Sequence, residues 1–196
     1  VGWNAGLSVT TGVDNTLIGG LAGDALTDAD NNVAVGRSAL GSDTLGSKST
    51  ALGRGALGAQ NFTTATDSNN TAVGYTAGNS VTTGTNNSFL GAAAGLNVTT
   101  GIENTLIGAL AGDALTDADQ NTAVGFAALG VDTLGSKSTA IGRSALATQN
   151  FTTATDSFNV AVGYHAGLEI TTGVKNTLIG GQAGDALTDA DFNVAI

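Results

Sequence analysis

The sequence contains no cysteine and no proline, a single histidine and a single tryptophan, and only 11% charged residues. Without cysteine, neither a disulfide framework nor a thiolate metal site is available, so the stabilising free energy has to come from packing. Six Lys and Arg residues stand against sixteen Asp and Glu residues, which gives a net charge of -10. Nucleic acid and anionic membranes both require clustered basic side chains, so the charge argues against either as a partner.

Long apolar runs are also missing, because no stretch approaches the roughly 20 residues that a membrane-spanning helix needs. The chain begins at Val1, inside a repeat, with neither an initiating Met nor a signal peptide, and we expect it to be a segment of a longer protein. Thirty glycines with few charged residues disfavour both an ordinary helical protein and a charge-rich disordered one. Small side chains favour closely stacked turns of β structure, about 4.8 Å apart.

What the sequence does contain is one repeated unit, first complete at Asn15-Thr16-Leu17-Ile18-Gly19. Its glycine recurs at positions 2, 19, 36, 53, 74, 91, 108, 125, 142, 163 and 180, each followed three residues later by alanine, at intervals of 17 residues eight times and 21 twice. Such a fixed period is the signature of a solenoid whose repeats stack on their neighbours. We therefore predict an all-β parallel β-roll or β-solenoid of about 11 turns of 17 or 21 residues, forming one array over residues 1–196.

The connectors between motifs repeat as well. The longest, Gln60 to Asp67, returns as Gln149 to Asp156 and accounts for both 21-residue intervals. The order of connectors defines superrepeats at approximately 15–103 and 104–175, of which the first is longer by 17 residues. Because 17 residues make one turn, a whole rung has been gained or lost, which a solenoid tolerates and a globular domain does not. We expect a rod of roughly 50 Å.

Within each motif, alternation along a strand predicts which side chains share a face. Positions 2 and 4 are Thr, Ser or Val followed by Ile, Val or Leu, and position 3 is Ala, Leu or Phe, so both faces are largely apolar. One face should fill the roll, and the other should pack against copies of the chain. The glycine is predicted to turn the chain, and the next residues to open a second short strand whose alanines form a ladder.

The motif Asn-Thr-Ala-Val-Gly-x-x-Ala, at Asn70 to Ala77 and Asn121 to Ala128, resembles the head repeats of trimeric autotransporter adhesins of the YadA type. It is also similar to related repeats of bacteriophage tail fibres. The resemblance covers essentially the whole chain. It implies a left-handed parallel β-roll, a homotrimer, and an extracellular fibre on a cell surface or a virion that binds a host surface, extracellular matrix or glycan receptor. The chain differs in its longer turns, since the adhesin heads have about 14 residues per repeat.

Acidic connectors are the candidate metal sites. Asp and Asn alternate there as oxygen ligands do in calcium loops, although the glycine and the terminal glutamate of an EF-hand are missing. The alternative is that these carboxylates are solvated turn residues that keep the rod soluble. The candidate calcium ligands are Asp24, Asp28, Asp30, Asp113, Asp117, Asp119, Asp185, Asp189 and Asp191. No other cofactor is predicted.

A second candidate site is the residue after each repeat glycine, where aromatic and arginine side chains recur. Such a stripe could stack on sugar rings, whereas intersubunit packing or simple exposure are the alternatives. Phe62 and Phe151, in the long connectors, could grip a ligand or lock onto a neighbouring chain. The candidate ligand-surface residues are Trp3, Arg37, Arg54, Tyr75, Phe126, Arg143 and Tyr164.

Catalytic motifs are not supported. Gly53 to Gly58 matches G-x-G-x-x-G, but its counterpart at Gly142 to Ala147 has lost two of the three glycines, and the lone His165 has no triad partners. We predict no enzymatic activity. A polysaccharide-cleaving tailspike would require carboxylates clustered in a groove. A glycan- or ice-binding solenoid remains the alternative to an adhesive fibre; a flat threonine ladder would favour it, whereas here threonine alternates with apolar residues inside strands.

Overall fold

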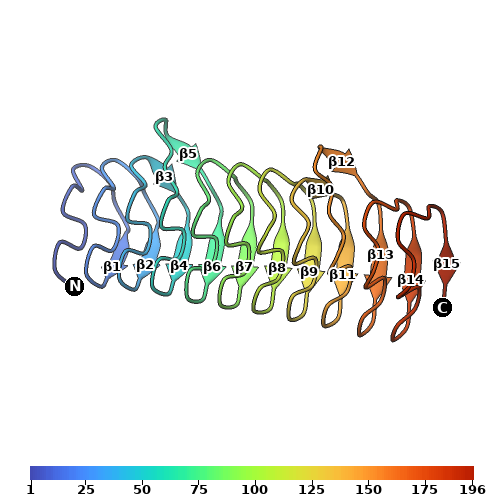
Figure 1. Cartoon of the computed structure of the whole chain (residues 1–196). Helices are drawn as coiled ribbons and strands as arrows, with labels where there is room; N and C mark the ends of the chain where they lie inside the picture. Colours follow the sequence, from blue (N-terminus) through green and yellow to red (C-terminus); the bar gives the residue numbers. More distant parts are fainter.

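Each copy of the motif forms one rung of a rod, because its central residues make a short strand that pairs with the strand of the next rung. In the computed structural model, which describes residues 1–196, Thr16 lies opposite Val33 and Leu17 opposite Ala34 in a parallel pair. The same register repeats along the chain, and the two termini lie at opposite ends of the rod (Figure 1). The predicted all-β parallel solenoid of about 11 turns is confirmed.

The main sheet has eleven parallel strands that follow one another along the rod. They are β1 (Thr16–Ile18), β2 (Val33–Val35), β4 (Thr50–Leu52), β6 (Thr71–Val73), β7 (Ser88–Leu90), β8 (Thr105–Ile107), β9 (Thr122–Val124), β11 (Thr139–Ile141), β13 (Val160–Val162), β14 (Thr177–Ile179) and β15 (Val194–Ala195). The structure contains no helix with the length and apolarity required to cross a membrane.

The core is a line of small and branched side chains that runs the length of the rod. Of the two strand faces, the one that carries the third motif position fills the roll, so Ala34, Phe89 and Leu106 are buried. The repeat alanines form a second buried column, and 27 buried residues make one continuous cluster. Because each rung covers the next, apolar surface is removed from water without a globular core.

The segment after each glycine is a turn, which corrects the prediction of a second strand there. Ala39 donates a backbone hydrogen bond of 3.3 Å to the carbonyl of Gly36, and Ser38 between them has a positive φ of 58°. A positive φ at this position is typical of a type II turn and is incompatible with a strand. The alanine ladder is nevertheless present, because the turn directs Ala39 into the core.

Two further pairs of strands come from the connectors. β3 (Gly46–Ser47) pairs with β5 (Thr66–Asp67), and β10 (Gly135–Ser136) with β12 (Thr155–Asp156). The long connector loops project from the rod beside β5 and β12 (Figure 1).

The prediction that the connector phenylalanines grip a ligand or a neighbouring chain is wrong. Phe62 and Phe151 are only 6% and 5% exposed. The backbone N–H of Phe62 donates a 3.0 Å hydrogen bond to the buried carboxylate of Asp43, which also accepts from Gly46 N. Both phenylalanines therefore serve to anchor the long loops on the rod.

A ladder of buried asparagines, which the sequence reasoning did not anticipate, joins the rungs on their inner side. The first motif position lies on the same face as the third, and Asn70, Asn87 and Asn104 are completely buried. The Nδ2 of Asn87 donates to the carbonyl of Gly101 at 2.8 Å. No buried side-chain nitrogen or oxygen lacks a hydrogen-bond partner. The polar core is thus fully satisfied, as a stable fold requires.

Candidate binding surface

The outer face of the eleven-stranded sheet carries two parallel columns of side chains. The fourth motif position is a branched aliphatic residue at every rung, and Leu90, Ile18 and Ile179 are 49%, 46% and 42% exposed. The second position is Thr, Ser or Val. No residue of either column is charged. The outer face predicted from alternation is therefore uncharged and carries one fully aliphatic column, and within a single chain it is uncovered.

The candidate ligand residues lie where the strands end. Each strand stops at the repeat glycine, and the following side chain projects from the turn at the edge of the sheet. Trp3, Tyr75, Phe126 and Tyr164 are 72%, 55%, 49% and 50% exposed. The three arginines in this column, at positions 37, 54 and 143, are also exposed. Because every rung has the same turn, these side chains form one column along the rod.

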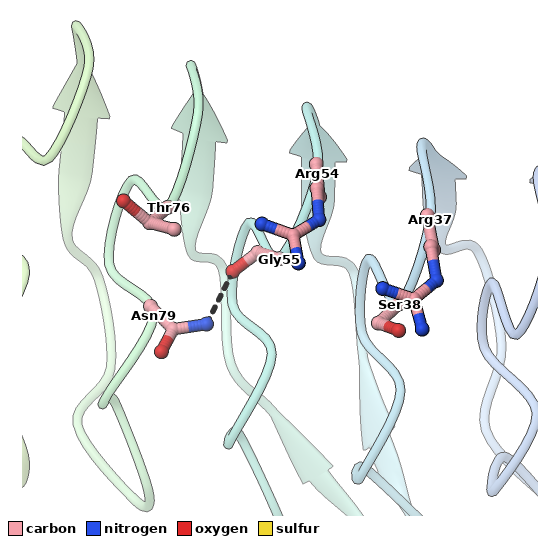
Figure 2. Close-up of a pocket in the computed structure, with 6 residues that line it drawn as sticks. All are labelled: Arg37, Ser38, Arg54, Gly55, Thr76 and Asn79. Carbon is pink, nitrogen blue, oxygen red and sulfur yellow. Dashed lines mark hydrogen bonds between the residues drawn. The ribbon is translucent and has the colours of Figure 1, made fainter.

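The first group in this column contains Arg37, Arg54 and Tyr75 on three successive rungs. The guanidinium carbon of Arg54 lies 5.6 Å from the centre of the Tyr75 ring, and its Nη1 donates a 2.9 Å hydrogen bond to the Tyr75 hydroxyl. A cation–π contact and a hydrogen bond together hold Arg54 in one position. Between Arg37 and Arg54 the surface is hollowed into a pocket of about 270 Å³, lined by Arg37, Ser38, Arg54, Gly55, Thr76 and Asn79 (Figure 2).

The second group has a different composition. Arg143 lies between two rings, with its guanidinium carbon 5.7 Å from the centre of Phe126 and 5.8 Å from that of Tyr164. The imidazole of His165 stacks on Tyr164 with ring centres 3.8 Å apart. No pocket forms here. This group therefore presents aromatic surface around one cation, whereas the first group presents a polar hollow with two.

The column is not a continuous stripe. Gly20 separates Trp3 from Arg37, and Ala92 and Ala109 separate Tyr75 from Phe126. Trp3 makes no cation–π or ring contact and does not line the pocket that joins Arg37 to Arg54. The structure therefore brings six of the seven candidates into two groups and leaves Trp3 alone.

The acidic connectors do not converge into a calcium cage, since no three acidic or histidine side chains come close enough to hold a metal ion. Asp30 and Asp119 instead accept hydrogen bonds of 2.7 Å and 2.8 Å from the backbone N–H of Val13 and Ile102, one rung earlier. Asp28 and Asp117 accept from threonine hydroxyls, again one rung earlier. Asp191 repeats the backbone contact with Val174. These carboxylates tie neighbouring turns together.

One carboxylate of the candidate set has a perturbed titration. Burial in its turn raises the pKa of Asp113 above its ordinary value of 3.8, although a backbone hydrogen bond acts in the opposite direction. Burial raises the pKa of a carboxyl because the charged form loses solvation. The raised pKa of Asp113 therefore reports local desolvation of this carboxyl.

A third column, at the residue before the asparagine or serine that begins each motif, was not singled out from the sequence. Lys137 Nζ lies 5.3 Å from the centre of the Phe158 ring, and Lys175 Nζ lies 5.1 Å from that of Phe192. All four residues have a positive φ, between 51° and 63°. Lys137 also pairs with Asp156 at 2.6 Å. This column could have been identified from the sequence, because its residues all lie one position before the start of a motif.

Comparison with known proteins identifies no relative: no family model, no curated protein and no solved structure matches the chain.

Proposed function

We propose that the chain is a structural and adhesive segment of an extracellular homotrimeric fibre, a bacterial surface adhesin or a phage tail fibre, that mediates attachment. The observation that carries the proposal is the uncharged and uncovered outer face of the sheet, with a branched aliphatic side chain on each rung. A contiguous exposed apolar patch larger than a few hundred Å² is uncommon on monomers and marks interaction surfaces.

A second copy of the chain is the occupant that this face fits best. The net charge of -10 opposes self-association in general, but the two face columns contain no charged residue. The acidic groups lie in the connectors, so two copies can approach through their sheets without bringing carboxylates together. Both copies have the same rung spacing, so contacts made at one rung repeat at every rung. Left-handed rolls packed three to a fibre are the arrangement we propose.

Attachment itself is assigned to the turn column that contains the two arginine and aromatic groups. This column lies at the edge of the sheet, beyond the strands that are proposed to pack together. A fibre with such a column would bind its receptor at surface sites spaced along its length, without cleaving it. Exposed aromatic rings beside arginines are suited to the faces and polar groups of sugars.

Two measurements test the proposal. Sedimentation equilibrium of the purified chain should give three times the mass of one chain, because burial of three apolar faces is favourable only in an assembly. Binding to immobilised cells, extracellular matrix proteins and glycans should be detected with the same preparation. A chain that sediments as a monomer at micromolar concentration would contradict the homotrimer.

The alternative, a glycan- or ice-binding solenoid face, gains support from one observation. Along each strand threonine alternates with apolar residues, as expected. Across the rungs, seven threonines and one serine share the second motif position on the outer face, in a column interrupted by Val33 and Val160. Regular hydroxyls about 4.8 Å apart beside an aliphatic column could order water or a polysaccharide chain. Thermal hysteresis or inhibition of ice recrystallisation by a monomeric chain would support this alternative. If neither activity is measured, the ice-binding form of the alternative is excluded.

A further inference from the structure

We infer that the pocket between Arg37 and Arg54 binds an anionic sugar unit, bearing a carboxylate or a sulfate, of an acidic polysaccharide. The inference rests on the proposed attachment function and names the receptor chemistry that this site would select. Three properties of the pocket carry it: unpaired positive charge, unused hydrogen-bonding groups and a difference from the equivalent place in the second superrepeat.

The pocket concentrates positive charge on an acidic molecule. The chain has only six basic residues, and two of them line this one hollow, which contains no acidic residue. The only salt bridges in the structure are Lys48–Asp67 and Lys137–Asp156, so neither Arg37 nor Arg54 is neutralised by a carboxylate. Arginine presents a planar fork that matches a carboxylate or sulfate in a bidentate geometry. Two uncompensated guanidinium groups at one hollow therefore favour an anion.

The lining also offers groups for the neutral part of a sugar. Asn79 Nδ2 donates to the carbonyl of Gly55 at 2.7 Å, which holds the amide in place and leaves its Oδ1 without a partner (Figure 2). Ser38 and Thr76 also line the pocket, and their hydroxyls make no hydrogen bond within the chain. The volume of about 270 Å³ is just below the range of roughly 300–1,000 Å³ typical of small-molecule sites. One sugar unit of a longer polymer fits this description.

The backbone holds the pocket in a fixed shape. Gly55 N donates to the carbonyl of Arg37 at 2.9 Å, and Thr76 N donates to the carbonyl of Arg54 at 2.9 Å. These bonds stack the turns that carry both arginines, and Figure 2 shows the two guanidinium groups at the same level of successive rungs. A site that is ordered before binding loses less conformational entropy when its ligand arrives.

The second superrepeat provides an internal comparison. Eighty-nine residues further along, Phe126 stands in place of Arg37, Ser144 in place of Gly55 and Leu168 in place of Asn79. One cation remains, and no pocket is present. The same backbone turn thus carries an anion-selective composition in one copy and an aromatic one in the other. The hollow is a property of its particular side chains and does not follow from the fold alone.

Calorimetric titration with three tetrasaccharides tests the inference: one of galacturonate, one of a sulfated galactan, and neutral cellotetraose. We expect binding of at least one anionic probe with an affinity that falls as salt is added, and no comparable binding of the neutral probe. Whichever of the two anionic probes binds identifies the group, carboxylate or sulfate, that the pocket recognises. Equal binding of the neutral probe, or no binding of either anionic probe at millimolar concentration, overturns the inference.

The variant Arg37→Phe converts the pocket to the composition of the second superrepeat and should weaken binding of the anionic probe about tenfold or more, since a charged hydrogen-bonding partner is lost. Lys175→Gln is the matched control, because it removes one exposed positive charge far along the rod and places there the residue type found at Gln120 in the same column. Its affinity should change less than about twofold. Thermal melting verifies that both variants are folded, and full affinity in Arg37→Phe overturns the inference.

Sedimentation of the same samples separates this inference from the proposed fibre. A monomer that binds acidic tetrasaccharides contradicts the homotrimer and supports the pocket. A trimer that attaches to cells but binds no anionic probe supports the fibre and overturns the pocket.

Discussion

The backbone N–H of Asn104 donates a 2.9 Å hydrogen bond to the side-chain Oδ1 of Asn87, one rung earlier. Asn87 N makes the same contact with Asn70 Oδ1, also at 2.9 Å. Each buried amide therefore spans the distance between two rungs and satisfies a backbone donor that the strand ladder does not reach. The Asn87 side chain makes all of its hydrogen bonds to the next rung, through Oδ1 to Asn104 and through Nδ2 to Gly101, so its loss leaves two backbone groups of that rung without partners.

Substitution of Asn87 by alanine should destabilise the rod by about 2–4 kcal/mol, because it leaves the N–H of Asn104 and the carbonyl of Gly101 buried without partners. Chemical denaturation monitored by circular dichroism measures the change. Asn97→Ala is the control, since Asn97 is exposed and its side chain makes one hydrogen bond, to the carbonyl of Asp113. Equal losses in the two variants would show that burial of the amide is not the cause.

The repeat glycines can be tested by a matched pair of alanine substitutions. A Cβ on Gly91 would lie 2.5 Å from the carbonyl oxygen of Gly108, and Gly91 has a φ of +141°. Gly91→Ala should therefore cost several kcal/mol or prevent folding, because backbone atoms of the next rung cannot move aside. At Gly20 the nearest atom would be 3.9 Å away, and Gly20→Ala should melt within a few degrees of the parent chain. Similar melting temperatures for the two variants would contradict the close stacking of rungs.

The period and the division of each motif between two faces could be predicted from the sequence because both depend on simple spacing. The asparagine ladder could have been predicted in the same way, since positions 1 and 3 share a face, but polar residues are not expected in a core. The second strand was predicted wrongly because the left-handed conformation of residues such as Ser38 is not visible in its residue type. Positive φ is uncommon outside glycine and asparagine.

The candidate binding residues were predicted as a column, but their grouping required the structure. Arg54 contacts Tyr75 across 21 residues of sequence, a separation that depends on the path of the long connector. The same path buries Phe62 beside Asp43. From the sequence, Phe62 was expected to contact a ligand or a neighbouring chain instead. Local spacing specifies which side chains share a face, whereas contacts between rungs depend on how each loop returns to the rod.

The raised pKa of Asp113 predicts a pH dependence. The folded chain binds the proton of this carboxyl more tightly than the unfolded chain, so the contribution to stability is fully present below the unfolded pKa and is lost as the pH rises through the folded pKa. Asp113→Asn should therefore be slightly more stable than the parent chain at pH 7, by no more than about 0.5 kcal/mol because the group is partly solvated, and equal to it at pH 3.

Thermal melting of both proteins between pH 3 and pH 7 measures this difference. Asp14→Asn removes the same charge from an exposed turn and reports the effect of net charge alone. If Asp113→Asn and Asp14→Asn change the melting temperature equally at every pH, desolvation at Asp113 is not responsible.

The outer face of the sheet predicts a change in assembly without a change in fold. Leu90 is 49% exposed on the face that we propose packs against other copies, between Val73 and Ile107 on the adjacent strands. Leu90→Lys should leave the circular dichroism spectrum unchanged, because the side chain is outside the core, and should convert the trimer to monomers. An unpaired ammonium buried at each of three interfaces would cost several kcal/mol per assembly.

Val131→Lys is the matched control, since Val131 is 48% exposed but lies in a connector away from the sheet face. It adds the same charge to an apolar site of equal exposure and should keep the sedimentation coefficient of the parent chain. If the two variants dissociate to the same extent, the added charge itself disrupts the assembly. If Leu90→Lys remains a trimer, the sheet face is not the contact, and the column of aliphatic side chains must be left open to water or to a ligand in the fibre.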